Sequence, residues 1–267
     1  MIKLICSDID GTLLNKERQL SARTIDEVKR LKNIPFILIS SRMPKAMFHL
    51  QQELQITALP MIAYNGGLII HHNKILASTE IALKQIQKIA DFCTNTKLHV
   101  SLYHNDQWFV PAMDYWAKRE QHNTKVTPVV KPIIETLKTW NTEKKGAHKI
   151  MCMGDKDEID ALVNFIDAQC KDSIIAYRSK DTYLEIAPKA ISKKTAIELL
   201  LQKEYPNLSL KNVMAFGDNY NDATMLKSVG IGVAVNNAKP QILALAKHKT
   251  DSNINDGVAL FLKQYFN

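Results

Sequence analysis

Cysteines are few in this 267-residue chain, and their spacing excludes two common kinds of site. Cys6, Cys93, Cys152 and Cys170 are widely separated and form no C-x-x-C pair. Cys6 and Cys152 lie within apolar runs, which favours buried free thiols over metal ligands or redox pairs. We therefore expect a protein of a reducing cytoplasm.

Long apolar runs and clustered basic residues are also missing. No uninterrupted apolar stretch approaches the roughly 20 residues that span a bilayer, and we expect no secretory leader at the N-terminus. The formal net charge of +8 could indicate nucleic acid. However, the lysines are spread along helical stretches, with no arginine-rich tail, which favours a solvated surface that attracts small anions. We expect neither a membrane nor a nucleic-acid partner.

What the chain does contain is a repeated layout, in which a short apolar run stops at a polar cluster. The runs are residues 2–5, 35–39, 60–64 and 212–216, and the clusters are residues 8–12, 40–42, 65–67 and 217–222. Such runs are typical of parallel strands buried on both faces. Helical stretches separate them, which predicts a doubly wound, mostly parallel, Rossmann-like α/β sheet with all four clusters along one edge.

The middle of the chain has a different pattern. Between about residues 81 and 187, helices alternate with short strands, and no strand there ends in an acidic pair with glycine. We interpret this part as an inserted α+β cap domain. The predicted organisation is a core formed by residues 1–80 and 188–267, with the cap at 81–187.

Carboxylates gather at the predicted sheet edge. If the strand ends meet, Asp8, Asp10, Asp218 and Asp222 share a small volume. Two unit charges 4 Å apart repel by about 4 kcal/mol at an effective dielectric constant of 20. Four such groups therefore require a cation. A set of oxygen ligands without convergent histidine or cysteine suits Mg²⁺.

Donors that can bind anionic oxygens lie at the same predicted edge. Ser40 and the amides that follow it end one strand, and Ser192 is placed to cap a helix whose first turn holds Lys193. The first turn of a helix favours phosphate. The combination predicts a phosphate-binding site beside the cation.

Taken together, these segments resemble the haloacid dehalogenase superfamily of phosphohydrolases, in particular its Cof-like branch with a large inserted cap. Its four ordered motifs match residues 8–12, Ser40, Lys193 and residues 217–222. The resemblance extends over nearly the whole chain, with further matches at residues 65–66, 184–186, 237–240 and 256–258. Two departures are visible. Ser40-Ser41-Arg42 replaces the commoner Thr-Gly-Arg, and Lys194 stands where glycine often follows the motif lysine.

The resemblance implies a role for each motif residue. Asp8 is the expected nucleophile, which forms an aspartyl-phosphate, and Asp10 the expected general acid and base. The expected Mg²⁺ ligands are Asp8, the backbone carbonyl of Asp10, and Asp218. Asp222 is expected to orient Lys193 or a metal-bound water. The residues expected to bind the substrate phosphate are Ser40, Ser41, Lys193 and Asn221.

The predicted function is a Mg²⁺-dependent phosphatase that acts on a small phosphate ester, such as a sugar phosphate or a phosphorylated cofactor. A phosphotransferase or mutase of the same superfamily and a non-catalytic phosphometabolite-binding protein are the alternatives. Substrate selection is expected from the cap, and the substrate and oligomeric state are left open. The cap candidates are Tyr103, His104, Trp108, Arg178 and Lys180.

Overall fold

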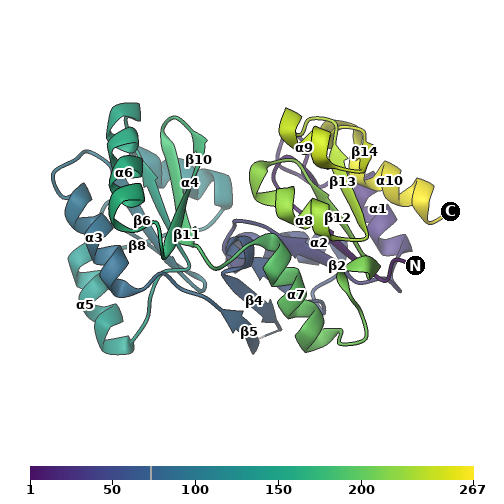
Figure 1. Cartoon of the computed structure of the whole chain (residues 1–267), viewed down its shortest axis with the longest axis horizontal. Coiled ribbons are helices and arrows are strands. Elements are labelled where there is room, and N and C mark those ends of the chain that lie inside the picture. The colour runs from purple at the N-terminus through teal and green to yellow at the C-terminus, as the bar shows by residue number, and fades with distance from the viewer. Residues whose placement is uncertain (73) are drawn as a thin grey trace. The chain divides into compact units, whose positions relative to one another are not determined.

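The chain folds into two compact units, one inserted into the other. The structure is a computed structural model that describes residues 1–72 and 74–267 (Figure 1). Unit 1 comprises Met1–Ala77 together with Ser192–Asn267, and unit 2 comprises Ser78–Ile191. The sequence places the corresponding boundaries at 80/81 and 187/188.

Unit 1 is built on an eight-stranded sheet with the order β14-β13-β12-β1-β2-β3-β4-β5. Its strands are β1 (Leu4–Ser7), β2 (Phe36–Ile39), β3 (Met61–Ala63), β4 (Leu68–His71), β5 (Lys74–Ser78), β12 (Val213–Gly217), β13 (Ile231–Val235) and β14 (His248–Thr250). The strands from β14 to β3 pair in parallel. β4 returns antiparallel to β3. The carboxyl ends of six strands therefore share one edge.

Helices accompany this sheet in two contacting groups. They are α1 (Ala22–Arg30), α2 (Phe48–Leu54), α7 (Lys193–Glu204), α8 (Ala223–Ser228), α9 (Pro240–Leu245) and α10 (Gly257–Tyr265). α1 packs against α2 and α10, whereas α8 packs against α7 and α9. The predicted doubly wound α/β core is confirmed. Ser21 caps α1 by accepting a hydrogen bond from the backbone N–H of Thr24, as its sequence position predicts.

Burial explains why the apolar runs form the central strands. Every residue of β1, β2 and β12 is buried, and full burial of a large aliphatic side chain contributes about 1.5–3 kcal/mol. The four runs noted in the sequence correspond to β1, β2, β3 and β12. The neighbouring strands β4 and β5 were not predicted. Part of each strand is exposed or half-buried, and so carries no continuous apolar signal.

Unit 2 contains a six-stranded sheet with the order β10-β11-β9-β6-β7-β8. Its strands are β6 (His99–His104), β7 (Gln107–Val110), β8 (Val129–Val130), β9 (Lys149–Met153), β10 (Ile174–Lys180) and β11 (Tyr183–Pro188). All pairs are antiparallel except β7 with β8. Its helices are α3 (Leu83–Cys93), α4 (Tyr115–Thr124), α5 (Ile133–Glu143) and α6 (Lys156–Gln169).

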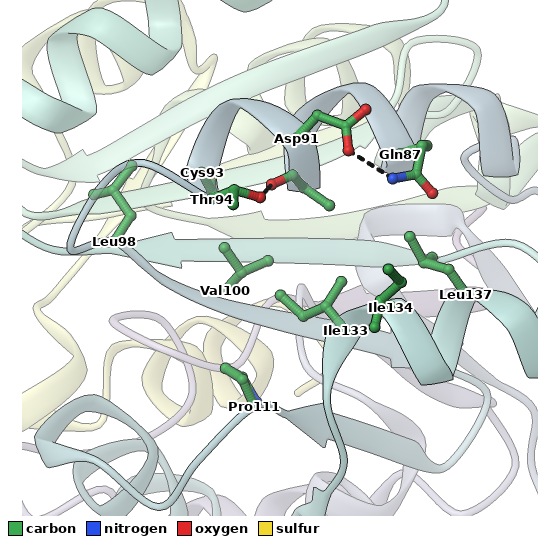
Figure 2. Close-up of a pocket in the computed structure, with 11 residues that line it drawn as sticks. Gln87, Asp91, Cys93, Thr94, Leu98, Val100, Pro111, Ile133, Ile134 and Leu137 are labelled. Carbon is green, nitrogen blue, oxygen red and sulfur yellow. Dashed lines mark hydrogen bonds between the residues drawn. The ribbon is translucent and has the colours of Figure 1, made fainter.

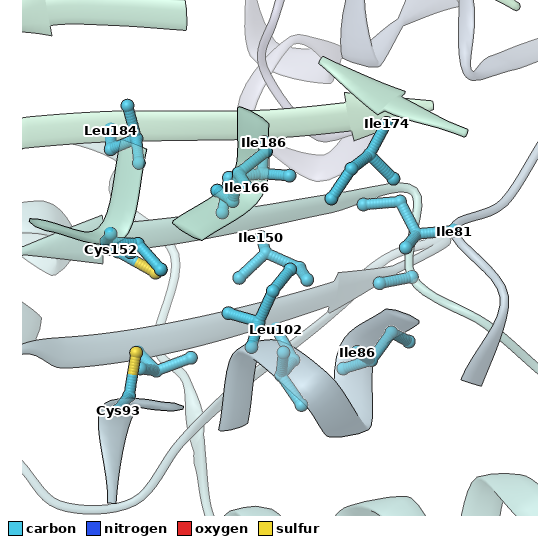
Figure 3. Packing of buried hydrophobic residues seen from close by; sticks show 14 of the residues in the cluster. Ile81, Ile86, Cys93, Leu102, Ile150, Cys152, Ile166, Ile174, Leu184 and Ile186 are labelled. Carbon is cyan, nitrogen blue, oxygen red and sulfur yellow. The ribbon is translucent and has the colours of Figure 1, made fainter. Parts of the chain in front are cut away.

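Unit 2 has a hydrophobic core of its own residues. α3, α5 and α6 contribute residues that pack against alternate positions of β6 and β9, including Leu102 and Ile150 (Figure 3). Cys93 and Cys152 lie within this cluster as free thiols. In unit 1, Cys6 is likewise fully buried and free. Burial raises the pKa of its thiol. The predicted buried free thiols are confirmed.

In the part of the chain that the structure describes, no helix is long and apolar enough to cross a lipid bilayer. The cytoplasmic location stays a prediction.

Candidate active site

The motif residues of unit 1 follow the ends of neighbouring strands. Asp8 directly follows β1, and Asp218 directly follows β12. These two strands pair in parallel with Leu4 opposite Val213, so their carboxyl ends lie side by side. Ser40 follows β2 on the other side of β1. In open α/β sheets this edge is where ligands bind.

Lys193 forms the electrostatic centre of the site. Its Nζ donates hydrogen bonds to Asp8 Oδ1 at 2.5 Å and to Asp222 Oδ1 at 2.6 Å, and its side chain is fully buried. Burial alone would lower the pKa of Lys193. The charges of Asp222 and Asp8 and the hydrogen bonds to them outweigh burial and raise that pKa, which keeps the ammonium charged.

The start of α7 holds Lys193 in place. Ser192 is the N-cap of this helix, and its side chain accepts a hydrogen bond from the backbone N–H of Thr195. The Thr195 hydroxyl accepts in return from the backbone N–H of Ser192, which completes a capping box. The predicted N-cap of α7 is therefore present, and it makes Lys193 the first helical residue.

Three carboxylates converge beside this lysine. Oxygen atoms of Asp8, Asp218 and Asp222 lie within 4.8 Å of one another. Burial raises the pKa of Asp8 well above its usual range, and the charges of Asp222 and Asp218 raise it further, against the opposing effect of Lys193. Burial and the charge of Asp222 also raise the pKa of Asp218 to about 6. A hard divalent cation with oxygen ligands would relieve this repulsion, so the donor set fits the cation that the sequence predicts.

Both carboxylate oxygens of Asp222 accept hydrogen bonds from residues of this cluster. Its Oδ1 accepts from Lys193, and its Oδ2 accepts from the backbone N–H groups of Asp218 and Asn219 at 2.9 and 3.0 Å. These bonds orient Lys193 and shape the turn that carries Asp218. The arrangement supports the predicted orienting role more than a role as a direct metal ligand.

The turn after β1 approaches Asp218 closely. Thr12 Oγ1 donates to Asp218 Oδ1 at 2.9 Å. Gly11 has φ of +82°, and a Cβ at this position would lie 2.5 Å from Asp218 Oδ2. The backbone conformation favours glycine, and a Cβ here would also displace the Asp218 carboxylate. Gly11 and Thr12 of the Asp-x-Asp-Gly-Thr segment thus contact the carboxylate of Asp218.

Asp10 departs from the sequence-based prediction that four carboxylates share one small volume. Its Oδ2 accepts from Arg42 Nε at 2.7 Å, and its Oδ1 accepts from Arg42 Nη2 at 2.7 Å and Arg18 Nη2 at 2.9 Å. Partial burial of Asp10 would raise its pKa, but the hydrogen bonds and charge of Arg42 and the charge of Arg18 lower it. The two guanidinium groups hold the Asp10 carboxylate, and Asp8, Asp218 and Asp222 form the acidic cluster without it.

The predicted phosphate-binding residues lie around the same strand ends. The hydroxyl of Ser40 is buried and accepts from the backbone N–H of Arg42 at 3.2 Å, so its own proton can be donated. Ser41 is half-buried in the following bend. Asn221 lies in the short turn η4 (Tyr220–Asp222), where its Nδ2 donates to Asn65 Oδ1 at 3.0 Å. Their binding of phosphate stays a prediction.

Arg18, Arg42 and Asn65 were given no role from the sequence. Arg42 was noted only as part of a motif, and Asn65 only as part of an Asn-Gly pair. A usable signal existed for Asn65, because an Asn-Gly pair favours positive φ, and its φ is +55°. Arg18 lies eight positions from Asp10 and belongs to none of the motifs, so its hydrogen bond to Asp10 could not be predicted from the sequence.

A second group in unit 2, Glu80, His104 and His148, has ligand atoms close enough for a metal. However, His104 Nδ1 bonds to the carbonyl oxygen of Gly146 at 2.9 Å and must therefore donate. His148 Nδ1 accepts from the backbone N–H of Asn105, which leaves the proton of the neutral ring on Nε2. The ring nitrogens nearest Glu80 thus both carry protons. The group is better explained as a hydrogen-bonded network than as a metal site.

Unit 2 also contains a Ser–His–Asp chain. Asp114 Oδ2 accepts from His99 Nδ1, and His99 Nε2 accepts from Ser101 Oγ, each at 2.7 Å. Ser101 is fully buried, and its oxygen also accepts from Trp108 Nε1 at 2.9 Å. A nucleophile must reach its substrate, so this chain does not fit nucleophilic catalysis. It fixes Trp108 instead.

The cap candidates named from the sequence have internal contacts. His104 and Trp108 are buried in the networks described above. Lys149 lies over the ring of Tyr103, with Nζ 4.6 Å from the centroid. Arg178 bonds to Asp160 and to the carbonyl of Asp181. Lys180 lies 5.6 Å from the centroid of the Tyr183 ring. The contacts of His104 and Trp108 indicate structural roles.

A cavity of about 250 Å³ lies between α3 and α5 of unit 2 (Figure 2). Its lining is mainly apolar, with Val100, Ile133 and Leu137 among the residues. Gln87 and Asp91 are also among the lining residues, and Gln87 Nε2 donates a hydrogen bond to Asp91 Oδ1 at 2.7 Å. The cavity has no convergent set of charged groups and is not a catalytic site.

Comparisons with known proteins agree with the site in unit 1. A family model described as haloacid dehalogenase-like hydrolase matches residues 5–262. A Haemophilus influenzae protein named "Putative phosphatase" is 32% identical, with 100% of this chain and 99% of the relative covered. Bacillus subtilis YitU, a 5-amino-6-(5-phospho-D-ribitylamino)uracil phosphatase, is 25% identical, with 98% and 97% covered.

A solved structure agrees with the fold. A haloacid dehalogenase-like hydrolase from Bacteroides thetaiotaomicron matches with a TM-score of 0.90 and 24% identity, and the match covers 100% of both chains. The family model and the relatives extend over both units, and the four motifs converge in unit 1 as the resemblance implies. The chain therefore belongs to the haloacid dehalogenase-like hydrolases.

Proposed function

We propose that this phosphatase is a Mg²⁺-dependent phosphomonoesterase that acts on a small phosphorylated metabolite, a sugar phosphate or a phosphorylated cofactor, through an aspartyl-phosphate on Asp8. The observation that carries the proposal is the fully buried ammonium of Lys193 held between Asp8 and Asp222, with Asp218 beside them. This cluster combines a carboxylate nucleophile, a fixed positive charge for phosphate and a place for a cation. The naming of YitU as a phosphatase of a phosphorylated small molecule supports the same substrate class.

The residues act in two steps. A carboxylate oxygen of Asp8 attacks phosphorus, the ester bond breaks, and Asp10 gives a proton to the leaving oxygen. A water oxygen then attacks the phosphorus of the aspartyl-phosphate and gives its proton to Asp10. The bond between phosphorus and the Asp8 oxygen breaks, which releases inorganic phosphate and restores Asp8.

The other motif residues bind and orient. Lys193, Ser40, Ser41 and Asn221 hold the phosphate oxygens, and Asp222 holds Lys193 in place. Asp8, Asp218 and the backbone carbonyl of Asp10 would hold Mg²⁺. When bound, Mg²⁺ offsets negative charge on the transferring phosphoryl group.

Activity should depend on the cation. We expect the purified chain with Mg²⁺ to release phosphate from members of a metabolite panel, to accept Mn²⁺, and to turn over poorly with Ca²⁺. Calcium prefers more ligands at longer distances and would hold the nucleophile out of line. The measurement is phosphate release with each ion after chelation, with Mg²⁺ added back as the control. Full activity in excess chelator would contradict the metal assignment.

The same panel separates the alternatives. A phosphotransferase or mutase would move the phosphoryl group to an added sugar faster than to water. A non-catalytic binding protein would release no phosphate from any ester while still binding one.

We also propose that residues 81–187 form the cap and select the substrate, and that residues 1–80 and 188–267 carry the chemistry. The proposed catalytic residues all belong to unit 1, and unit 2 has its own core. If Ser78–Ile191 is excised and the ends are bridged, the core should keep turnover of 4-nitrophenyl phosphate but lose discrimination among metabolites. The measurement is the ratio of kcat/KM for the best metabolite and for 4-nitrophenyl phosphate, after thermal unfolding has verified a folded core. An unchanged ratio would place specificity outside the cap.

A further inference from the structure

We propose that Arg42 is a positioning residue for Asp10, which aims its carboxylate for the step in which water attacks the aspartyl-phosphate. The inference rests on the proposed function. Its basis is a bidentate pair, in which Arg42 Nε donates to Asp10 Oδ2 and Arg42 Nη2 donates to Asp10 Oδ1, each at 2.7 Å. A two-point contact between a planar guanidinium and a planar carboxylate fixes orientation as well as distance.

Arg42 is itself held at several points. Its side chain is 8% exposed, and its Nη1 donates to the carbonyl oxygen of Ala46 at 3.2 Å. Its backbone N–H donates to Ser40 Oγ at 3.2 Å, and its carbonyl accepts from the backbone N–H of Tyr64 at 3.1 Å. The guanidinium therefore extends from a fixed support.

The support includes an unusual stretch of backbone. Tyr64, Asn65 and Gly66, which form the short turn η2, all have positive φ. For residues other than glycine this conformation is uncommon, and it persists where surrounding contacts enforce it, often near functional sites. Here the backbone N–H of Tyr64 bonds to Arg42, and that of Asn65 bonds to the carbonyl of Ser40 at 2.8 Å. The turn braces the segment that carries both Ser40 and Arg42.

Asp10 depends on such a support. It lies in the turn after β1, and its side chain is 42% exposed, so burial does not fix its orientation. Arg18 adds one bond to Oδ1, but the Arg18 side chain is 46% exposed and gives a single contact. Arg42 therefore supplies most of the geometric restraint.

Both Asp10 oxygens are fixed by the two-point contact with Arg42, so the direction of this carboxylate depends on Arg42. The step in which Asp10 takes a proton from the attacking water depends on that direction for every substrate, whereas the first step needs no general acid when the leaving group is good. If Arg42 is removed, formation of the aspartyl-phosphate from an ester that needs no general acid should be little affected. Breakdown of the intermediate should slow, and the phosphorylated protein should accumulate.

The test compares Arg42→Met, Arg42→Lys and Arg18→Met with the unmodified full chain by rapid quench, using 4-nitrophenyl phosphate and Mg²⁺. We expect Arg42→Met to lower steady-state turnover about tenfold or more, because general acid–base catalysis contributes roughly 10²–10⁴-fold. A burst of 4-nitrophenolate that approaches one per active site should precede the slow phase. Acid-trapped phosphoprotein should rise to match it.

The other variants sharpen the comparison. Arg42→Lys keeps the positive charge but loses the two-point contact, so phosphoprotein should accumulate as in Arg42→Met. This variant replaces Arg42→Met in the test if Arg42→Met does not fold. Arg18→Met should give a smaller defect. Arg30→Met, which removes an ion pair with Glu27 on α1, is the matched control and should leave both phases unchanged.

The outcomes separate the two proposals. No release of 4-nitrophenolate or phosphate by the unmodified chain would sink the proposed function. An active unmodified chain whose folded Arg42 variants accumulate no phosphoprotein would overturn the role of Arg42. Equal slowing of burst and steady state, or a defect in Arg18→Met as large as that in Arg42→Met, would also overturn it.

Discussion

Replacing Asp8 with asparagine should abolish turnover and leave the fold intact. The substitution preserves the shape of the side chain but removes the oxygen nucleophile that forms the covalent intermediate. We expect kcat below one per cent of the parent value, which corresponds to about 2.7 kcal/mol or more in activation free energy. The measurement is phosphate release with Mg²⁺, together with acid trapping of phosphoprotein, which should be absent.

Stability gives a second readout for Asp8→Asn. Asp8, Asp218 and Asp222 surround a single lysine, so loss of one carboxylate leaves less uncompensated negative charge. The free energy of unfolding without metal should therefore hold or rise. Asp26→Asn, on the exposed side of α1, is the matched control and should change neither quantity. Asp8→Ala guards against deamidation of the new asparagine. Activity of Asp8→Ala above one per cent would count against Asp8 as the nucleophile.

Replacing Lys193 with methionine should remove activity and destabilise unit 1. Methionine fills a similar volume but leaves the buried carboxylates of Asp8 and Asp222 without their cation. Breaking a buried ion pair by removing one partner costs about 3–5 kcal/mol. We expect a loss of this size in the free energy of unfolding, measured by denaturant titration without metal at pH 8.

The loss should depend on pH. Lys193 opposes the rise in the pKa of Asp8, so its removal raises that pKa further. A carboxyl group whose pKa is raised in the folded state favours folding at low pH, and that contribution is lost as pH increases through the folded pKa. The Lys193→Met chain should therefore lie closer in stability to the parent at pH 5 than at pH 8. Mg²⁺ should recover part of the loss.

Lys194→Met is the matched control for this experiment. Lys194 follows Lys193 in α7, but its side chain is 38% exposed and pairs with Glu198 on the same helix face. Exposed pairs contribute about 0–1 kcal/mol, so we expect near-parental stability and activity. A Lys193→Met chain as stable as Lys194→Met at pH 8 would show that the buried pair contributes nothing.

The sequence by itself determined the core fold and the place of the site. Apolar runs that end in polar clusters specify buried parallel strands, and the parallel arrangement brings Asp8, Ser40 and Asp218 to one edge whatever the remaining details. The helix start at Ser192 and Lys193 could also be predicted, because a capping residue acts on its immediate neighbours. The need for a cation followed from the number of carboxylates. In each case the determining interaction is local or follows from strand direction.

Other features depended on contacts between residues distant in the chain. The eight-stranded order, with β4 returning antiparallel, and the pairing of β9 with β6 and β11 arise from which faces can be buried together. The full burial of Lys193 requires Asp8 and Asp222, which lie 185 and 29 positions away.

The orientation of Asp10 shows the difference most clearly. The sequence places Asp10 two residues from Asp8 and so predicts four carboxylates in one cluster. In the structure, Arg42, which is 32 positions away, takes both oxygens of Asp10 and leaves a cluster of three. The end of a strand determines where a residue lies. The direction of its side chain depends on which charged partner can form the best-aligned hydrogen bonds with it. Only the tertiary structure brings that partner within reach.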